Sequence, residues 1–172
     1  MFLNQIKNFF IQNKINKSLA NVKHLSSNDT IKTIGIIYDE TILNKRNDLV
    51  KLLQNNGVKE SDISILVFKD KIYKNELFDK PTFSHHDLSW SSSFYNAEVT
   101  YFIDQKFDLL INYYDNEKLP LLLATNLSKA TFKVGFSEIN KKLNHFIINS
   151  KIAEVKIFVE ELFKYLKILN KI

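Results

Sequence analysis

The sequence predicts an α/β protein: a single three-layer, Rossmann-like or flavodoxin-like domain with a mostly parallel, five-stranded sheet in the order 2-1-3-4-5. Residues 106–136 read as strand, helix and strand. Two apolar runs there are too short for helices, and the piece between them is long enough to cross over a sheet. Residues 31–68 repeat this arrangement. Such units pair their strands in parallel and place the connecting helix on a face of the sheet.

The composition fits one globular domain. Of the 172 residues, 45% are hydrophobic, which excludes a disordered or fibrous chain. Cysteine is absent, which excludes disulfides, thiolate zinc sites and cysteine nucleophiles. No apolar run approaches the roughly 20 residues of a spanning helix, and the N-terminus lacks the features of a signal peptide. We therefore expect a cytoplasmic protein without an integral membrane segment.

Residues 1–25 are predicted to form a basic amphipathic helix outside the α/β domain of residues 26–172. The first 28 residues contain no acid and supply four of the five net positive charges, through Lys7, Lys14, Lys17 and Lys23. At 100° per residue the apolar side chains fall on two faces, so this helix either bends near Asn13 or packs on two surfaces. One face carries Leu3, Ile6, Phe9 and Phe10, and the other carries Ile11, Ile15, Leu19 and Val22.

This N-terminal helix has two possible uses. It packs on the domain with its lysines in water, or it is an arm that contacts a protein partner, RNA or a membrane surface. Only one of the 24 basic residues, Arg46, is an arginine. Because arginine makes most forked contacts to phosphates and bases, its scarcity weakens the nucleic-acid alternative.

The first half of the domain comprises a strand over Ile31–Tyr38, a helix over Leu43–Asn56 and a strand over Ile63–Phe68. Gly35 would let a neighbouring group approach the first strand closely. The turn after this strand lacks the glycines with which a Rossmann loop approaches a pyrophosphate, and Asp39 and Glu40 would repel phosphate there. We therefore predict no cofactor.

Residues 69–93 show no sustained periodicity, and a segment of this size is usually functional or disordered. Its chemical groups are His85, His86, Asp87 and Trp90, which we regard as a candidate lid. Histidine and aspartate are common metal ligands. However, neighbouring side chains of an extended chain point apart, so at most two of the three could meet one ion. No metal site is predicted.

The second half adds a helix over 96–105, a strand over 107–113, a helix over 120–127, a strand ending at 136, an extended piece over 145–149 and a helix over 152–169. Pro120 falls in the first turn of its helix, where a missing N–H costs least. The last helix has one broad apolar stripe, which is typical of a helix that covers a sheet. A dimer seam is the alternative.

Two resemblances add to this picture. The segment from Phe107–Ile111 through Lys133–Phe136 resembles part of the N-terminal half of heptosyltransferase-type glycosyltransferases. It covers about 30 residues of a structural unit and no catalytic residue, so it implies only the fold. The order of a basic helix, a "TIGIIYDE" strand and a "FDLLINYY" unit resembles a family of short bacterial α/β proteins with a domain of unknown function. That resemblance covers most of the chain and implies no activity.

Ligands of open parallel sheets bind beyond the carboxyl ends of the strands, where neighbouring connections diverge. For the predicted order this point lies between the first and third strands. The residues that emerge there are Asp39, Glu40, Thr41, Asn112, Tyr114 and Asp115, with Ser137 and Glu138 nearby. Acids, amides and tyrosines suit a polar or cationic ligand or a protein partner. Alternatively, these strand ends bind nothing and are polar only because they contact water.

Three functional hypotheses follow. The chain is a non-catalytic cytoplasmic binding or adaptor module, with a possible protein partner at the N-terminal helix. Alternatively, it is a small enzyme of unrecognised type, with a site at the ends of the first and third strands. As a third possibility, it is an RNA- or ribosome-associated protein that uses its N-terminal lysines, and whose binding would weaken steeply with salt.

Overall fold

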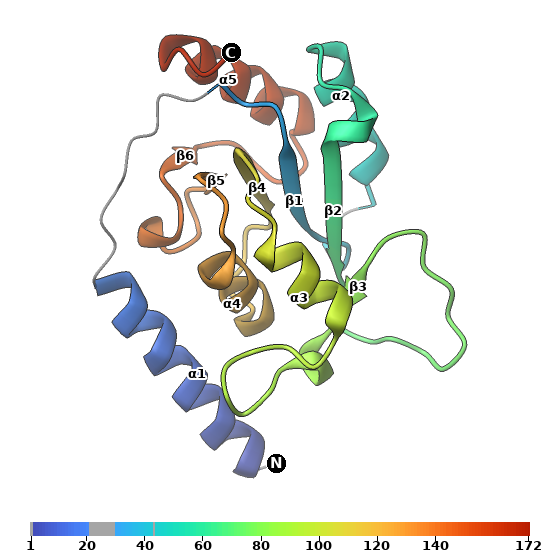
Figure 1. Ribbon diagram of the computed structural model, residues 1–172, viewed down its shortest axis with the longest axis vertical. Helices are drawn as coiled ribbons and strands as arrows, with labels where there is room; N and C mark the ends of the chain where they lie inside the picture. The colour runs from blue at the N-terminus through green and yellow to red at the C-terminus, as the bar shows by residue number, and fades with distance from the viewer. Residues whose placement is uncertain (1, 21–29, 43) are drawn as a thin grey trace.

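The structure is a computed structural model that describes residues 2–20, 30–42 and 44–172. Its centre is an open sheet of six parallel strands (Figure 1). The strands are β1 (Ile34–Asp39), β2 (Ile63–Phe68), β3 (Thr82–Phe83), β4 (Leu109–Tyr113), β5 (Phe132–Phe136) and β6 (Phe146–Ile148). Their order is β3-β2-β1-β4-β5-β6. The predicted α/β class is confirmed.

Helices cover both faces of the sheet. They are α1 (Phe2–Ala20), α2 (Arg46–Asn55), α3 (Ala97–Asp104), α4 (Leu119–Leu127) and α5 (Val155–Ile168). One apolar core joins α1, α3 and α4 to one face, and a second core joins α2 and α5 to the other (Figure 1). These two cores form because β1 and β4 are buried along their whole length, so both faces of each strand need apolar partners.

The predicted sheet of five strands in the order 2-1-3-4-5 was wrong, because the sheet has six strands and begins with β3. Thr82 and Phe83 pair in parallel with Val67 and Phe68, at the edge beyond β2. They lie within the segment 69–93, which we expected to be irregular. Two residues after a proline are too few to produce a periodic pattern, and only their pairing with β2 defines them as a strand.

Gly35 in β1 confirms the expectation of a close neighbour. A Cβ atom at this position would lie 2.5 Å from Cδ2 of Phe107, well inside van der Waals contact. Phe107 immediately precedes β4 and is itself buried. The pairing of β1 with both β2 and β4 also has a functional consequence. The chain leaves β1 towards β2 and leaves β4 towards β5, so the connections diverge at the carboxyl ends of these two central strands.

Candidate functional site

Asp39 ends β1 at the point where the connections diverge, and its side chain is fully buried. Oδ1 accepts hydrogen bonds from the Thr41 backbone N–H at 2.9 Å and from the Thr41 hydroxyl at 2.6 Å. Oδ2 accepts one from Asn116 Nδ2 at 3.3 Å and lies 3.1 Å from Nζ of Lys118. Both carboxylate oxygens are therefore engaged, which is what a buried charge requires.

Lys118 connects Asp39 to the segment after β2. Its Nζ lies 3.2 Å from Asp70 Oδ1 and 5.0 Å from the centre of the Phe68 ring, and it donates to the Thr41 hydroxyl. Asp70 in turn lies 3.8 Å from Nε2 of His85. Burial lowers the pKa of His85, with Asp70 opposing and Lys118 reinforcing the shift.

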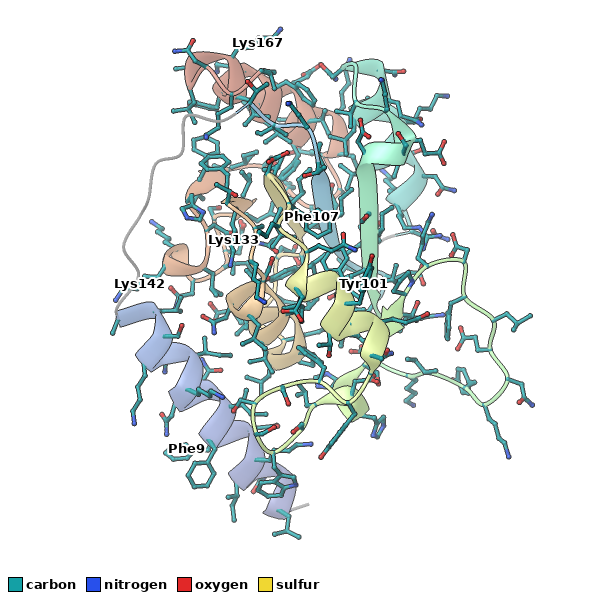
Figure 2. The ribbon with its side chains drawn as sticks, in the orientation of Figure 1. Phe9, Tyr101, Phe107, Lys133, Lys142 and Lys167 are labelled. Atoms are coloured by element: carbon teal, nitrogen blue, oxygen red, sulfur yellow. The ribbon has the colours of Figure 1, made fainter. Side chains whose placement is uncertain are left out.

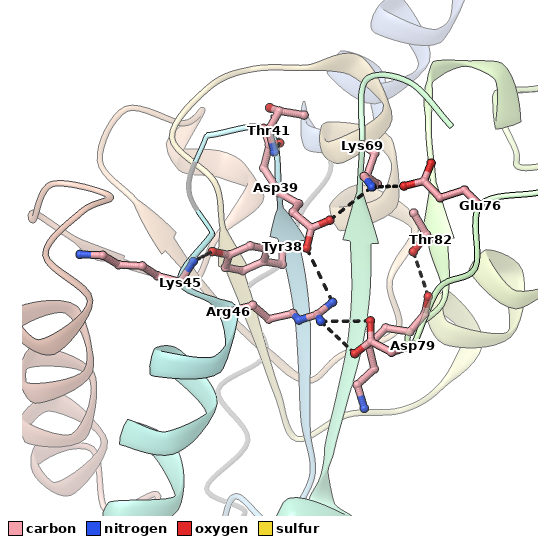
Figure 3. A network of polar contacts seen from close by, with 11 residues as sticks. Tyr38, Asp39, Thr41, Lys45, Arg46, Lys69, Glu76, Asp79 and Thr82 are labelled. Atoms are coloured by element: carbon pink, nitrogen blue, oxygen red, sulfur yellow. Dashed lines mark hydrogen bonds and ion pairs between the residues drawn. The ribbon is translucent and has the colours of Figure 1, made fainter. Parts of the chain in front are cut away.

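A second group of charges continues this edge outward (Figure 3). Arg46 donates to both carboxylate oxygens of Asp79, at 2.8 and 3.0 Å, and Lys69 pairs with Glu76. Glu40 lies between the two cations, 3.9 Å from Arg46 and 3.8 Å from Lys69. The hydrogen bond to Glu76 raises the pKa of Lys69 and lowers that of Glu76. Every charge in this group has an opposite charge beside it.

The structure brings together only part of the predicted rim. Asp39, Thr41 and His85 are linked through Asp70 and Lys118, and Glu40 joins the outer group. No sequence pattern predicted Asp70, Lys118 or Asn116 at this edge. Lys118 lies 79 residues from Asp39, and no local pattern relates the two positions.

The other predicted rim residues lie elsewhere. Asn112 and Tyr114 are completely buried on the α4 side of the sheet, where both bond to the hydroxyl of Thr125. Ser137 donates to Glu138 and to Asn149, away from Asp39 and its partners. Asp115 is half-buried. Asn112 and Tyr114 lie on the face that α4 covers, so their side chains enter the core instead of the open end of the sheet.

The remaining candidate lid residues stabilise their own loop or face outward. Asp87 accepts from both the backbone N–H and the hydroxyl of Ser84, which forms a capping box on the short helical turn of residues 85–87. His86 is exposed, and the side chain of Trp90 is 51% exposed. No group of three or more histidine, aspartate or glutamate side chains that could hold a metal occurs in the part of the chain that the structure describes.

The two apolar faces of α1 differ in their surroundings. Ile11, Ile15 and Leu19 are buried in the core that α1 shares with α4. The opposite face is exposed: the exposed fractions are 66% for Leu3, 64% for Phe9 and 58% for Phe10. The helix is assigned without interruption and packs on one surface, so the second apolar face has no cover among the described residues.

Two lysines of the basic arm fasten α1 to the loop before α3. Lys7 donates to the carbonyl of Leu88 at 3.3 Å, and Lys14 donates to the carbonyl of Ser91 at 2.9 Å. Figure 1 shows this loop beside α1. Lys17 also interacts with another residue of the chain. Val22 and Lys23 lie outside the described residues. Lys7 and Lys14 are thus used in packing the helix.

Within the described ranges, no helix combines the length and the apolar character needed to span a bilayer. Comparisons with curated proteins and with solved structures gave no match. A family model does match, over residues 7–169, which include most of α1 and all six strands. On this match, the chain belongs to the family described as "Family of unknown function (DUF6913)".

Proposed function

We propose that this protein is a non-catalytic cytoplasmic binding module, which docks on another protein through the exposed apolar face of α1. The observation that carries this proposal is the exposure of Leu3, Phe9 and Phe10 on a helix whose other face is anchored. Aromatic side chains are the usual anchors of protein interfaces, and a helix with one free apolar face fits an apolar groove. Burying one phenylalanine contributes about 1.5–3 kcal/mol.

The carboxyl edge of the sheet gives less support to an enzyme. A general base needs an oxygen that is free to accept a proton, and both oxygens of Asp39 are occupied by Thr41, Asn116 and Lys118. The outer charges are paired in the same way. An arrangement of this kind joins the ends of β1 and β2 to the segment of residues 70–85, which is a structural role.

The same face of α1 favours a protein over RNA or a membrane surface. Those two partners are attracted mainly by positive charge, and Lys7 and Lys14 already donate to carbonyl oxygens of the neighbouring loop. The helix contains no arginine. The large apolar side chains that it exposes, Leu3, Phe9 and Phe10, suit a dry protein groove.

The experiment compares the wild-type protein with the double variant Phe9→Ser/Phe10→Ser as immobilised baits. Retained proteins are identified by mass spectrometry and then re-tested as purified components by calorimetry. Tyr101→Ser is the matched control, because Tyr101 is 71% exposed on α3. We expect at least a tenfold loss of affinity for the helix variant only. Thermal melting of both variants should stay close to that of the wild type, since exposed positions contribute little to stability.

Two outcomes would contradict the proposal. One is retention that both variants share with the wild type. The other is binding that nuclease treatment or 0.5 M salt abolishes, or flotation with vesicles of anionic lipid in place of a protein partner, because these results indicate an RNA or membrane partner.

A further inference from the structure

A chain of polar side chains crosses the otherwise apolar layer between the sheet and α4. Asn144 accepts from Asn112 Nδ2 at 2.6 Å, and Asn112 accepts from the Thr125 hydroxyl at 2.8 Å. This hydroxyl lies 2.6 Å from that of Tyr114. All four residues are at most 3% exposed. Polar groups are costly in such a layer, so their presence on a central strand calls for a reason beyond packing.

This chain ends at a small cavity of about 90 Å³ beside the C-terminal part of α1. Its polar lining includes Lys133 from β5, Lys142 from the turn before β6, Asn144 and His145, and α1 contributes Ser18 and Leu19. Figure 2 shows Lys133 inside the fold and Lys142 near the end of α1. None of the described residues that line it carries a carboxylate. For comparison, one water molecule occupies about 30 Å³ in the liquid.

The lining offers hydrogen-bond donors in excess. Asn144 Nδ2 is buried and has no hydrogen-bond partner among the described residues. Lys133 donates to the carbonyl of Thr125 at 2.7 Å and forms no ion pair within the described part of the chain, which leaves two of its three N–H groups. His145 Nδ1 accepts from the backbone N–H of Lys133, so the neutral ring carries its proton on Nε2.

Burial changes the ionisation of this lysine. Desolvation lowers the pKa of Lys133 to about 8. A protein that keeps a poorly solvated ammonium beside a second lysine and an unsatisfied amide has a site whose natural complement is negative charge with several acceptor oxygens.

We propose that this cavity binds a small oxyanion of the size of inorganic phosphate, held by Lys133, Lys142 and Asn144. The volume admits a phosphate or a carboxylate group and is too small to enclose a whole nucleotide. The site is separate from the carboxyl edge of β1 and independent of the apolar face of α1. It lies under the buried side of that helix, because Ser18 and Leu19 belong to its wall.

The test is a titration of the full-length protein at pH 7 with sodium phosphate, followed by the amide NMR signals of Lys133 and Asn144. Sodium chloride keeps the ionic strength constant, and sodium acetate is titrated in parallel to separate phosphate from carboxylate recognition. We expect saturable shifts with phosphate and at least tenfold weaker binding in Lys133→Met and in Lys142→Gln. Lys141→Gln is the matched control, because Lys141 is the neighbouring lysine of the same turn and is not among the described residues that line the cavity.

Two lysine variants are used so that the test still stands if one of them does not fold. The dispersion of the amide signals in the same spectra shows whether each variant is folded. Saturation by acetate at least as strong as by phosphate would overturn the assignment to a phosphate-sized anion. Shifts that rise linearly and equally in all variants would overturn the site itself, since they indicate non-specific attraction to surface lysines.

Discussion

Replacing Lys133 with methionine should make the protein more stable at neutral pH. The pKa of this lysine falls from 10.5 to about 8 on folding, because burial disfavours its charged form. At 1.36 kcal/mol per pKa unit, holding the ammonium in the fold below pH 8 costs about 3 kcal/mol. Methionine removes this cost and fills a similar volume, but it loses the hydrogen bond to the Thr125 carbonyl, worth about 1 kcal/mol. The expected net gain is about 2 kcal/mol.

The sign of the pH dependence follows from the same shift. Between pH 8 and 10.5 the unfolded chain holds a proton on Lys133 that the folded chain has released, so the wild type gains stability as pH rises. The variant lacks this gain. The difference between the two proteins should therefore be full below pH 8 and should vanish or reverse near pH 10.5.

The assay is urea unfolding of wild type, Lys133→Met and the control Lys141→Met at pH 7 and pH 10, in a buffer without phosphate. Linear extrapolation gives each free energy of unfolding. Lys141 is exposed, so its replacement should change stability by less than about 0.5 kcal/mol at both pH values. A Lys133→Met variant that is less stable than the wild type at pH 7, by a margin that does not change with pH, would refute the reasoning.

Three further predictions concern other contacts. Gly35→Ala should lower the free energy of unfolding in urea by about 1–3 kcal/mol, because the new methyl group meets the ring of Phe107. An unchanged urea midpoint would show that the ring moves freely. Asp39→Ala should cost about 1–3 kcal/mol, because the groups of Thr41 and Asn116 that donate to the buried carboxylate lose their acceptor while Lys118 keeps Asp70; a melting temperature equal to that of the wild type would contradict this. Asp108→Ala should cost about 2 kcal/mol at pH 7, since the carboxylate accepts three hydrogen bonds from residues 32 and 33. Burial opposes the ionisation of Asp108, but these hydrogen bonds hold its pKa below 3.8, so the wild type loses this advantage only as pH falls through that lower pKa. Acid unfolding curves of the two proteins that stay parallel down to pH 2 would count against it.

Local patterns in the sequence determined much of the architecture. Strands β1, β2 and β4 were recognisable as short, mostly apolar segments, because a strand buried on both faces needs apolar side chains on successive residues. The amphipathic stripe of α5 and the two apolar faces of α1 were equally local. Gly57, which follows α2, has φ +92°, a left-handed conformation that glycine adopts without strain.

The candidate site was only partly predictable, for a physical reason. The position of Asp39 at the end of a strand followed from the sequence, but its partners come from a helix start and a loop that are distant along the chain. The periodicity of a strand shows that the side chain of Asn112 points to the face opposite that of its two neighbours. It does not show which helix covers the face to which Asn112 points. The burial of Asn112 and Tyr114 under α4 therefore had no sequence signal.

The sequence by itself determined the class of fold, the parallel pairing and the doubled apolar surface of the N-terminal helix, because these depend on residues a few positions apart. Only the tertiary structure decided which of those two surfaces is buried, that a two-residue strand extends the sheet, and that Lys133, Lys142 and Asn144 share one cavity. Each of these depends on contacts between distant segments, whose energies no local pattern records.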